Sequence, residues 1–534
     1  MTHHRLRFVK TRVWNTEDNP GHFPELDDHA GLKVPWLTEE RRKFGVAFSG
    51  GGTRSASATL GQLRGLKHAG LLDQVGYISA VSGGSWAATP FTYLPDNFDE
   101  DTFLGVARNP EELEPDDFDD APSGSLVRAI ADSVITDDFL IEAAKLSGDE
   151  TYSRAVGNIF LKPFGLDEID RFFTFHEGAR DAAVEGNSRA DDGRYFLSPD
   201  DFYLAREGRP YLVLGGTILR LDNSGDSRQK IQCEYTPLYT GVRKLFPTAG
   251  RRRTPIGGGY VESFAYDSKN PRERWGNQRW LVKLGRRRHR LTLSDIIGSS
   301  GAAPEGKLAR IGLNFIGFPE FEHWPIHDIS GIDEEEYGHG DGGLLENLGL
   351  MPLLARKVEN IILFVNTLAP FDPGNPDPKK HFADSIAPLF NPVPDHDDPS
   401  SGNDFAVNVV FENGTDRLHD LIEGLRQRQA AGQALIHCDT YDVKDNDHYK
   451  IANYQARICW IYNENADQWR SALNPQVRSL LEEAEFARFP HYRTFFENPP
   501  SVIDLSRRQV NALAHLSCWG VVTSGDEIRS HFGL

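Results

Sequence analysis

Residues 44–94, FGVAFSGGGTRSASATLGQLRGLKHAGLLDQVGYISAVSGGSWAATPFTYL, decide the fold of this chain. The apolar run FGVAF leads into three glycines, and the segment after them places Leu60, Leu63 and Leu66 at helical spacing. A second apolar run, GYISAV, then meets the glycine-rich turn SGGS and the small-residue segment SWAATP. The order strand, turn and helix, repeated twice, predicts a parallel α/β unit.

The glycine run after the first strand is a candidate anion site. In residues 49–54, SGGGTR, backbone N–H groups point outward at a helix N-terminus. That arrangement suits a nucleotide phosphate, a dinucleotide pyrophosphate or the oxyanion of acyl transfer. The run lacks the Gly-Lys-Ser/Thr of a Walker loop, and Ser55 stands where the dinucleotide pattern needs a third glycine. The oxyanion interpretation remains, beside that of a tight turn without a ligand.

The second glycine-rich turn places a serine where hydrolases often carry a nucleophile. Ser82 follows an apolar strand and precedes a small-residue helix, as in the G-x-S-x-G elbow. Ala80 replaces the first glycine of that pattern and Gly84 fills the last position. Ser82 lies 31 residues after Gly51, so both turns are expected at the carboxyl ends of adjacent strands. Ser85 is a rival nucleophile, although the end of the apolar strand favours Ser82.

A serine nucleophile needs a base, and the segment YGHGDGG (337–343) contains two candidates. Asp341, between glycines before a helical segment, is a candidate base or, alternatively, a helix N-cap. His339 would face the same side of an extended strand, two residues earlier. None of the 18 histidines stands in a recognisable triad context. The residues alone leave both candidates open.

Outside this unit the sequence pattern changes. Residues 1–43 are polar and irregular and are predicted to form an N-terminal arm. Residues 95–205 are acidic at first and then helical in pattern, which predicts a mostly helical insertion. Strand-like runs return at 210–219, 233–242, 360–368 and 455–463. We therefore expect a single α/β domain over residues 44–534, with a largely parallel central sheet.

Composition and charge exclude several classes of protein. With 534 residues, 39% hydrophobic and 25% charged, the chain has the composition of a soluble globular protein. Its net charge of −20 opposes nucleic acid as a partner. Residues 96–120 hold 11 acidic residues but lack the ligand pattern of an EF-hand, and are interpreted as a solvated segment. Two basic clusters, 251–253 and 286–290, either contact anionic head groups or form solvated loops.

The cysteines and the N-terminus bear on location. The four cysteines lack metal-ligand spacing and are predicted to be buried thiols: Cys233, Cys438, Cys459 and Cys518. The N-terminus has no apolar secretory region, and no run approaches 18 apolar residues. We expect a cytoplasmic protein, with peripheral contact with a membrane surface left open.

The three motifs, in this order, resemble those of the catalytic domain of cytosolic phospholipase A2 and, more distantly, of patatin-like lipid acyl hydrolases. SGGGTR (49–54) is similar to the family's glycine loop, AVSGGSW (80–86) to its nucleophile elbow, and DGGLLENLGLMPLL (341–354) to its Asp loop. The resemblance covers most of residues 40–370, with further traces at 157–166, 234–242 and 299–304. Ala80 and Gly84 depart from the animal enzymes. Only residues 1–43 precede the first strand, so no calcium-binding lipid-targeting domain is expected there.

This resemblance implies a three-layer fold and a Ser–Asp dyad in place of a triad. Ser82 would attack the ester carbonyl, and Asp341 would act as the general base. The oxyanion hole falls to the backbone N–H groups of Gly51 and Gly52. Three further residues are assigned to substrate binding: Arg54, which either stabilises the site or meets the lipid phosphate, Trp86 and Asn347. An aspartate base is weak unless burial raises its pKa, so the site is expected to be partly dry.

The function that the resemblance implies is hydrolysis of acyl esters in glycerophospholipids or lysophospholipids. Nucleophile, base and oxyanion donors are all protein groups, so neither a metal nor another cofactor is expected. The expected partners are a lipid ester substrate and, peripherally, a membrane surface. The alternatives are a broader lipid esterase or transacylase and a non-catalytic lipid-binding scaffold. The joint presence of the dyad, the two glycines and the arginine speaks against the scaffold.

Overall fold

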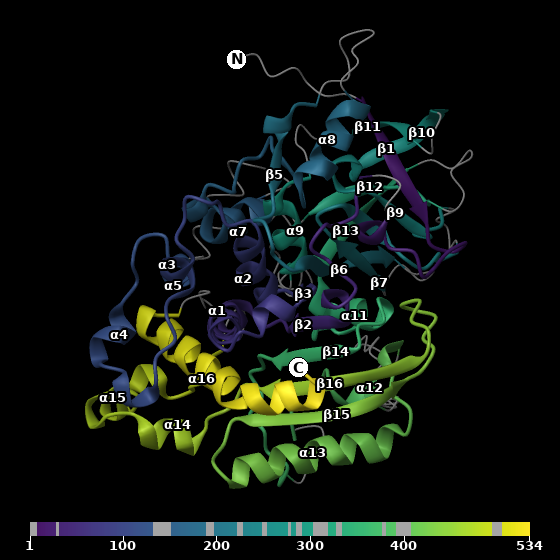
Figure 1. Ribbon diagram of the computed structural model, residues 1–534. Helices are drawn as coiled ribbons and strands as arrows, with labels where there is room; N and C mark the ends of the chain where they lie inside the picture. The colour runs from purple at the N-terminus through teal and green to yellow at the C-terminus, as the bar shows by residue number, and fades with distance from the viewer. Residues whose placement is uncertain are drawn as a thin grey trace.

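The elements of this chain surround one large sheet, as the computed structural model in Figure 1 shows. The structure describes residues 8–27, 31–131, 151–187, 197–221, 228–247, 254–275, 279–284, 291–302, 319–326, 334–375, 381–390, 407–493 and 505–534. Both basic clusters of the sequence analysis, 251–253 and 286–290, lie outside these residues.

Five parallel strands form the centre of the sheet. In spatial order they are β16 (Tyr454–Tyr462), β14 (Asn360–Val365), β2 (Phe44–Phe48), β3 (Tyr77–Val81) and β6 (Tyr211–Leu221). The three inner strands are buried along their whole length. Such burial on both faces explains why they read as continuous apolar runs. The predicted α/β class is confirmed at this centre.

On both sides of this centre the strands are antiparallel, so the sheet is mixed, whereas a largely parallel one was expected. In the described residues the sheet has 14 strands. Those outside the centre are β15 (Leu435–Val443), β7 (Arg228–Tyr235), β8 (Tyr239–Val242), β9 (Gly259–Glu262), β1 (Phe8–Asn15), β11 (Arg279–Leu284), β10 (Ser268–Trp275), β12 (Glu320–His323) and β13 (Glu335–Asp341). The physical reason is connection length: β6, β7 and β8 follow one another closely along the chain, and short connections join antiparallel neighbours.

Strand β1 comes from the segment predicted as an arm. It pairs with β9 on one edge and β11 on the other. Val9 and Thr11 are fully buried, whereas their neighbours along the strand are partly exposed. This alternation is a strand pattern, but it is too short to stand out in a polar segment.

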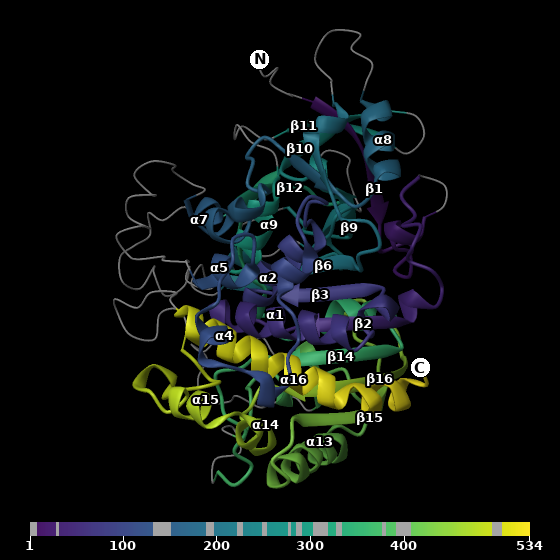
Figure 2. The same cartoon turned by 60° about the vertical axis from the view of Figure 1, so that its left-hand side comes forward.

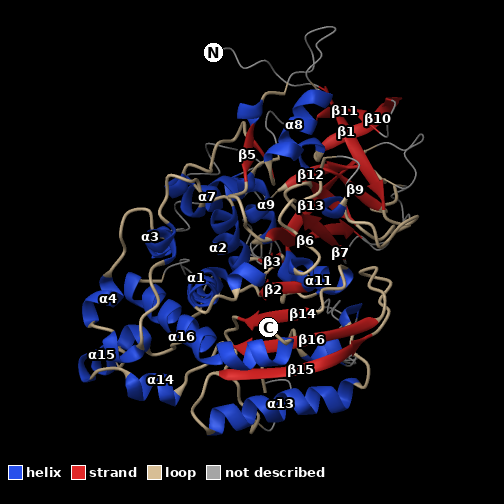
Figure 3. Cartoon of the chain, in the orientation of Figure 1, coloured by secondary structure: helices blue, strands red, loops and turns tan. Residues whose placement is uncertain are grey.

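Helices α1 (Gly52–His68) and α16 (Arg507–Phe532) lie side by side on one face of the sheet (Figure 2). They can approach closely because Gly61 has no side chain. A Cβ at this position would lie only 2.1 Å from the Ala514 carbonyl oxygen. Helix α2 (Gly83–Thr92) packs beside α1, and α13 (Gly414–Ala430) lies against β15 at the sheet edge (Figure 3). The other helices after residue 205 are α9 (Leu293–Ser300), α11 (Met351–Ala355), α12 (Ala387–Phe390), α14 (Asp467–Ala472) and α15 (Pro475–Leu480). None of the helices in the described ranges is long and apolar enough to cross a bilayer.

The segment 95–205 contains short helices and two short paired strands at its described positions. These elements are α3 (Glu100–Leu104), α4 (Pro115–Asp119), α5 (Leu126–Ala131), α7 (Thr151–Phe160), β4 (Phe172–Thr174), α8 (Glu177–Gly186) and β5 (Phe202–Leu204). The acidic stretch is not simply solvated, because Phe103 and Phe118 are fully buried. Asp119 also forms a two-pronged ion pair with Arg508 of α16, at 2.8 and 3.0 Å. Apolar anchors between the acidic residues therefore hold this stretch against the body of the protein.

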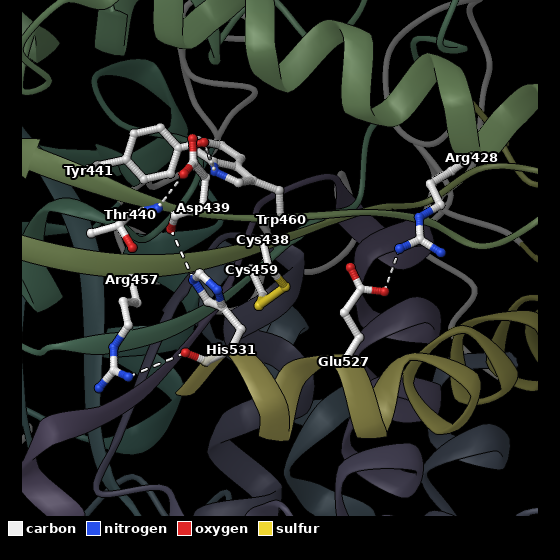
Figure 4. Close-up of a disulfide and its surroundings, with 10 residues drawn as sticks. All are labelled: Arg428, Cys438, Asp439, Thr440, Tyr441, Arg457, Cys459, Trp460, Glu527 and His531. Atoms are coloured by element: carbon white, nitrogen blue, oxygen red, sulfur yellow. Dashed lines mark hydrogen bonds and ion pairs between the residues drawn. A yellow bond between two sulfur atoms is a disulfide. The ribbon is translucent and has the colours of Figure 1, made fainter. Parts of the chain in front are cut away.

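The prediction of buried thiols is wrong for two of the four cysteines. Cys438 on β15 lies directly opposite Cys459 on β16, and the two form a disulfide. Figure 4 shows the end of α16 beside this bond, where His531 contacts the carbonyl oxygen of Asp439. The other two cysteines are free and buried, as predicted: Cys233 and Cys518. A separation of 21 residues does not reveal which positions of two paired strands face each other, so the sequence alone could not pair them.

Candidate active site

Ser82 stands at a sharp turn between β3 and α2. Its φ of +51° and ψ of −127° lie in a region that residues with a side chain rarely adopt. The turn is possible because Gly83 follows it: a Cβ there would lie 1.9 Å from the carbonyl oxygen of Gly52. The strained backbone places the Ser82 side chain beyond the carboxyl end of β3, as the elbow pattern predicts.

Strand β6 brings the serine and the aspartate together. On one edge it pairs first with β3, up to Val81 opposite Gly215. It then pairs with β13, from Asp341 opposite Gly216. Its other edge carries β7 throughout this region, so β3 and β13 meet end to end on a single edge of β6. We call this place the strand junction.

The Ser82 hydroxyl donates a hydrogen bond to Asp341 across this junction. The distance from Oγ to Oδ2 is 2.8 Å, and both side chains are buried. The other carboxylate oxygen, Oδ1, accepts the backbone N–H of Gly343 at 2.7 Å. Asp341 is thus both the N-cap of the short turn η10 (Gly342–Leu344) and the partner of the serine. The N-cap interpretation is confirmed, and the same side chain lies where the base interpretation requires it, next to Ser82.

Burial sets the proton affinity of Asp341. Removal from water raises the pKa of its carboxyl from 3.8 to about 6, although the hydrogen bonds from Gly343 and Ser82 act in the opposite direction. A carboxylate with a pKa near 6 is still ionised at neutral pH and accepts a proton more readily than an ordinary aspartate. This matches the partly dry site expected for an aspartate base.

The glycine loop lies against Ser82. A Cβ at Gly50 would be 3.0 Å from the Ser82 Cβ and 2.2 Å from the Asn347 side-chain oxygen. Gly51 and Gly52 have φ values of +143° and +58°, which only glycine adopts without strain. Helices α1 and α2 both begin here, so two helix N-termini, each with a positive end, converge at the serine. The arrangement suits a developing negative charge.

Asn347 lies between the two loops of the site. Its backbone carbonyl accepts the N–H of Gly50 at 2.9 Å, and its side-chain oxygen faces Gly343 as well as Gly50. A Cβ at Gly343 would stand 2.5 Å from that oxygen. The structure therefore brings Asn347 to the site, where it connects the glycine loop to the Asp341 loop.

Arg54 begins from the site but turns away into the protein. Only 4% of it is exposed. Its Nε donates to the carbonyl oxygen of Asn366 at 3.3 Å, and its Nη1 to that of Tyr492 at 2.5 Å. A Cβ at Gly51 would lie 2.6 Å from its Nη2. The guanidinium therefore packs against the glycine loop on the side that faces the protein interior.

Trp86 is also in the interior. It is 2% exposed, stacks on Phe160 at 4.8 Å between ring centres, and donates from Nε1 to the carbonyl oxygen of Ile297 at 3.2 Å. These contacts connect α2 with α7 and α9. Trp86 is four residues after Ser82, so it lies one helical turn away on α2, on the side that packs against the body of the protein.

The rival residues are engaged elsewhere. Ser85 is fully buried and donates to the carbonyl oxygen of Ser82 at 2.6 Å. His339 is fully buried on β13, where its Nδ1 lies 2.5 Å from the Tyr235 hydroxyl. Burial, with a smaller contribution from the nearby His323, holds the pKa of His339 well below its usual value. Both residues are part of the packing around the site.

Two features of the site were not expected from the sequence. One is the Gly215–Gly216 pair in β6: a Cβ at Gly216 would stand 2.5 Å from the Tyr235 ring, and one at Gly215 would press on Val81. The other is Ser300, whose hydroxyl lies 3.0 Å from the Ser82 backbone nitrogen. The segment around Ser300 belongs to one of the weaker traces of family resemblance, which was the available signal. Within the described parts of the chain, no cluster of His, Cys, Asp and Glu side chains is placed to hold a metal ion.

Comparisons with known proteins find similarity to proteins named cytosolic phospholipase A2. No family model matches the chain. The human and mouse proteins named cytosolic phospholipase A2 zeta are each 58% identical to it over 41 residues, 8% of this chain and 5% of theirs. Human GIVD cytosolic phospholipase A2 aligns with 94% of this chain and 62% of its own, at 12% identity and a TM-score of 0.47. The same protein in complex with methyl gamma-linolenyl fluorophosphonate gives 14% identity, a TM-score of 0.44, and coverage of 92% and 58%. The chain thus spans less than two thirds of the proteins that it matches.

Proposed function

We propose that this protein is a serine lipid acyl hydrolase that cleaves acyl esters of glycerophospholipids or lysophospholipids through a Ser82–Asp341 dyad. The observation that carries this proposal is the 2.8 Å hydrogen bond from the Ser82 hydroxyl to a buried carboxylate, at a strained turn between a strand and a helix. A serine paired in this way with a base is the arrangement that nucleophilic catalysis requires.

The first half of the reaction forms an acyl enzyme. Asp341 takes the proton of the Ser82 hydroxyl as Oγ attacks the ester carbonyl carbon. The tetrahedral oxyanion accepts hydrogen bonds from the backbone N–H groups of Gly51 and Gly52, beside the two helix N-termini. Each such donor is typically worth about 3–4 kcal/mol of barrier. The intermediate collapses, and the departing alcohol takes the proton from Asp341.

The second half restores the enzyme. Water gives a proton to Asp341 and attacks the acyl-Ser82 ester, again through an oxyanion at the glycine loop. Collapse releases the fatty acid, and Asp341 returns the proton to Oγ. The raised pKa of Asp341 serves both halves, because the same carboxyl accepts and gives a proton in each.

The supporting residues follow from their contacts. Arg54 lies against Gly51 and donates to the backbone carbonyl groups of Asn366 and Tyr492, so we assign it to support of the glycine loop and not to the lipid phosphate. Asn347 keeps the glycine loop and the Asp341 loop at a fixed distance. The lipid class rests on the three motifs and on the 41-residue segment that is 58% identical to cytosolic phospholipase A2 zeta. Every role in this reaction falls to a protein group, so we propose no metal or other cofactor, and we propose that the protein meets lipid at a membrane surface.

A fluorophosphonate probe tests the proposal directly. The wild type should be labelled at a single serine, identified as Ser82 by peptide mass spectrometry, and should release fatty acid from mixed phospholipid vesicles. Ser82→Ala and Asp341→Asn should each remove both activities. Ser85→Ala is the matched control that keeps them, because the Ser82 carbonyl oxygen still accepts the backbone N–H of residue 85 at 2.9 Å. Because the pair acts as a unit, the double variant should be no worse than either single one. Label at Ser85, or none in a folded wild type, would overturn the proposal.

A further inference from the structure

Ser300, the last residue of α9, contacts the nucleophile on its backbone side. Its fully buried hydroxyl lies 3.0 Å from the Ser82 nitrogen and 2.7 Å from the Gly215 carbonyl oxygen. A carbonyl oxygen can only accept, so the Ser300 hydroxyl gives its proton to Gly215 and accepts the N–H of Ser82. One hydroxyl therefore connects the turn that carries the nucleophile to β6 at the strand junction.

The place of Ser300 is fixed by the packing of α9. Trp86 of α2 donates to the Ile297 carbonyl oxygen at 3.2 Å, and Tyr152 of α7 donates to that of Gly301 at 2.6 Å. Two bulky side chains from two other helices thus hold the last turn of α9 on either side of Ser300. The hydroxyl is presented to the elbow by a rigid support.

The elbow needs such support. The conformation of Ser82, with φ at +51°, is costly and persists only where its surroundings hold it. Loss of the Ser300 hydroxyl would leave two buried backbone groups without this partner, the N–H of Ser82 and the carbonyl of Gly215. The turn could then relax, and any rotation at Ser82 moves Oγ away from Asp341.

We propose that Ser300 is a positioning residue for the nucleophile: its hydroxyl holds the Ser82 backbone so that Oγ faces Asp341. By engaging the Ser82 N–H, it also leaves the oxyanion to the donors of the glycine loop. This inference rests on the proposed function but concerns a residue outside the dyad, the glycine loop and the substrate contacts assigned from the sequence.

The test measures how fast Ser82 reacts, separately from binding. A fluorophosphonate probe gives a maximal labelling rate and a half-saturating concentration for each variant. Ser300→Ala should lower the maximal rate at least tenfold and leave the half-saturating concentration within twofold of wild type. Ser300→Cys keeps the volume but has a weak hydrogen-bonding group, and should show the same loss. Ser299→Ala removes an equally buried hydroxyl from the adjacent position and should stay within twofold of wild type.

The outcomes separate this inference from the proposed function. If wild type and Ser299→Ala are labelled at Ser82 and both Ser300 variants react within twofold of them, the positioning role is wrong and the dyad stands. If Ser300→Ala falls only as far as Ser299→Ala, the role is equally wrong. If Ser300→Ala does not fold, the size-matched Ser300→Cys decides by the same criteria. If the folded wild type is not labelled at all, the proposed function fails first.

Discussion

Replacement of Asp341 by asparagine should abolish catalysis and yet make the protein more stable at neutral pH. Burial raises the pKa of this carboxyl from 3.8 to about 6. The folded state therefore disfavours the ionised carboxylate, which is the form that acts as the base. Asparagine has nearly the same shape, can still accept the N–H of Gly343, and can donate to the Ser82 oxygen. It removes the charge and keeps the contacts.

The magnitude follows from linkage. A pKa that is raised on folding means that stability is fully present below the unfolded-state value and is lost as the pH rises through the folded-state value. Ionisation of Asp341 should thus lower the free energy of unfolding by about 3 kcal/mol above pH 6.5, by about 1 kcal/mol at pH 4.5, and hardly at all below 3.8. Asp341→Asn should be more stable than wild type by these amounts.

Urea denaturation of both proteins at pH 7.5 and pH 4.5 measures the difference. Glu346, in the same loop, also has a pKa raised by burial, to about 7, but its contribution is common to both proteins and cancels. Glu234→Gln is a control of opposite sign. Burial opposes the ionisation of Glu234, but Arg356 at 2.9 Å and the nearby Arg243 outweigh it and hold its pKa below the usual range. That variant should be less stable than wild type at pH 7.5.

Two results would refute the reasoning about Asp341. One is an Asp341→Asn protein that is less stable than wild type at pH 7.5, which would mean that the carboxylate stabilises the fold in its ionised form. The other is a variant that keeps more than about 1% of the wild-type hydrolysis rate, since a general base typically contributes 10²–10⁴-fold.

Three further predictions concern the same molecule. The rate at which a fluorophosphonate labels Ser82 should rise with pH through about 6 and then level off, because only ionised Asp341 accepts the serine proton. Labelling rates measured at a series of pH values test this, and a flat profile from pH 5 to 8 would exclude Asp341 as the base. Arg54→Ala should lower turnover of phospholipid and of a neutral short-chain ester by the same factor, since the guanidinium supports the glycine loop; a loss confined to phospholipid would assign it to the phosphate. Thiol counting in denaturant should find two free thiols before reduction and four after it, and four thiols from the start would contradict the disulfide. The double variant Cys438→Ser, Cys459→Ser should have a free energy of unfolding about 3 kcal/mol lower than that of wild type.

The parts of the site that depend on local backbone geometry could be predicted from the sequence. Glycines at positions 51 and 52 and a serine between a strand and a helix demand particular turns, and the structure contains both turns. The contact between Ser82 and Asp341 was predicted from the family resemblance, since 259 residues separate them and local pattern says nothing about such a distance.

Other parts depend on packing that no local pattern records. Trp86 and Arg54 belong to motifs beside the site, but their side chains point into the interior, a direction set by helices far along the chain. The pairing of Cys438 with Cys459 depends on strand register, and the antiparallel flanks of the sheet depend on how far each connection reaches. The fold class and the contact between Ser82 and Asp341 could be predicted, whereas the supporting contacts required the structure.

The strand junction on β6 bears on how this protein can vary. Strands β3 and β13 approach from opposite directions and both end there, opposite Gly215 and Gly216. Additions or deletions at their far ends, before Tyr77 or before Glu335, leave the spacing at the junction unchanged. A single residue inserted between Gly215 and Gly216 would instead move one strand end away from the other by about 3.3 Å and turn the following side chains to the opposite face. Evolution or a designer can therefore lengthen or shorten β3 and β13 at their far ends and keep the contact between Ser82 and Asp341, provided that the two consecutive glycines of β6 stay as they are.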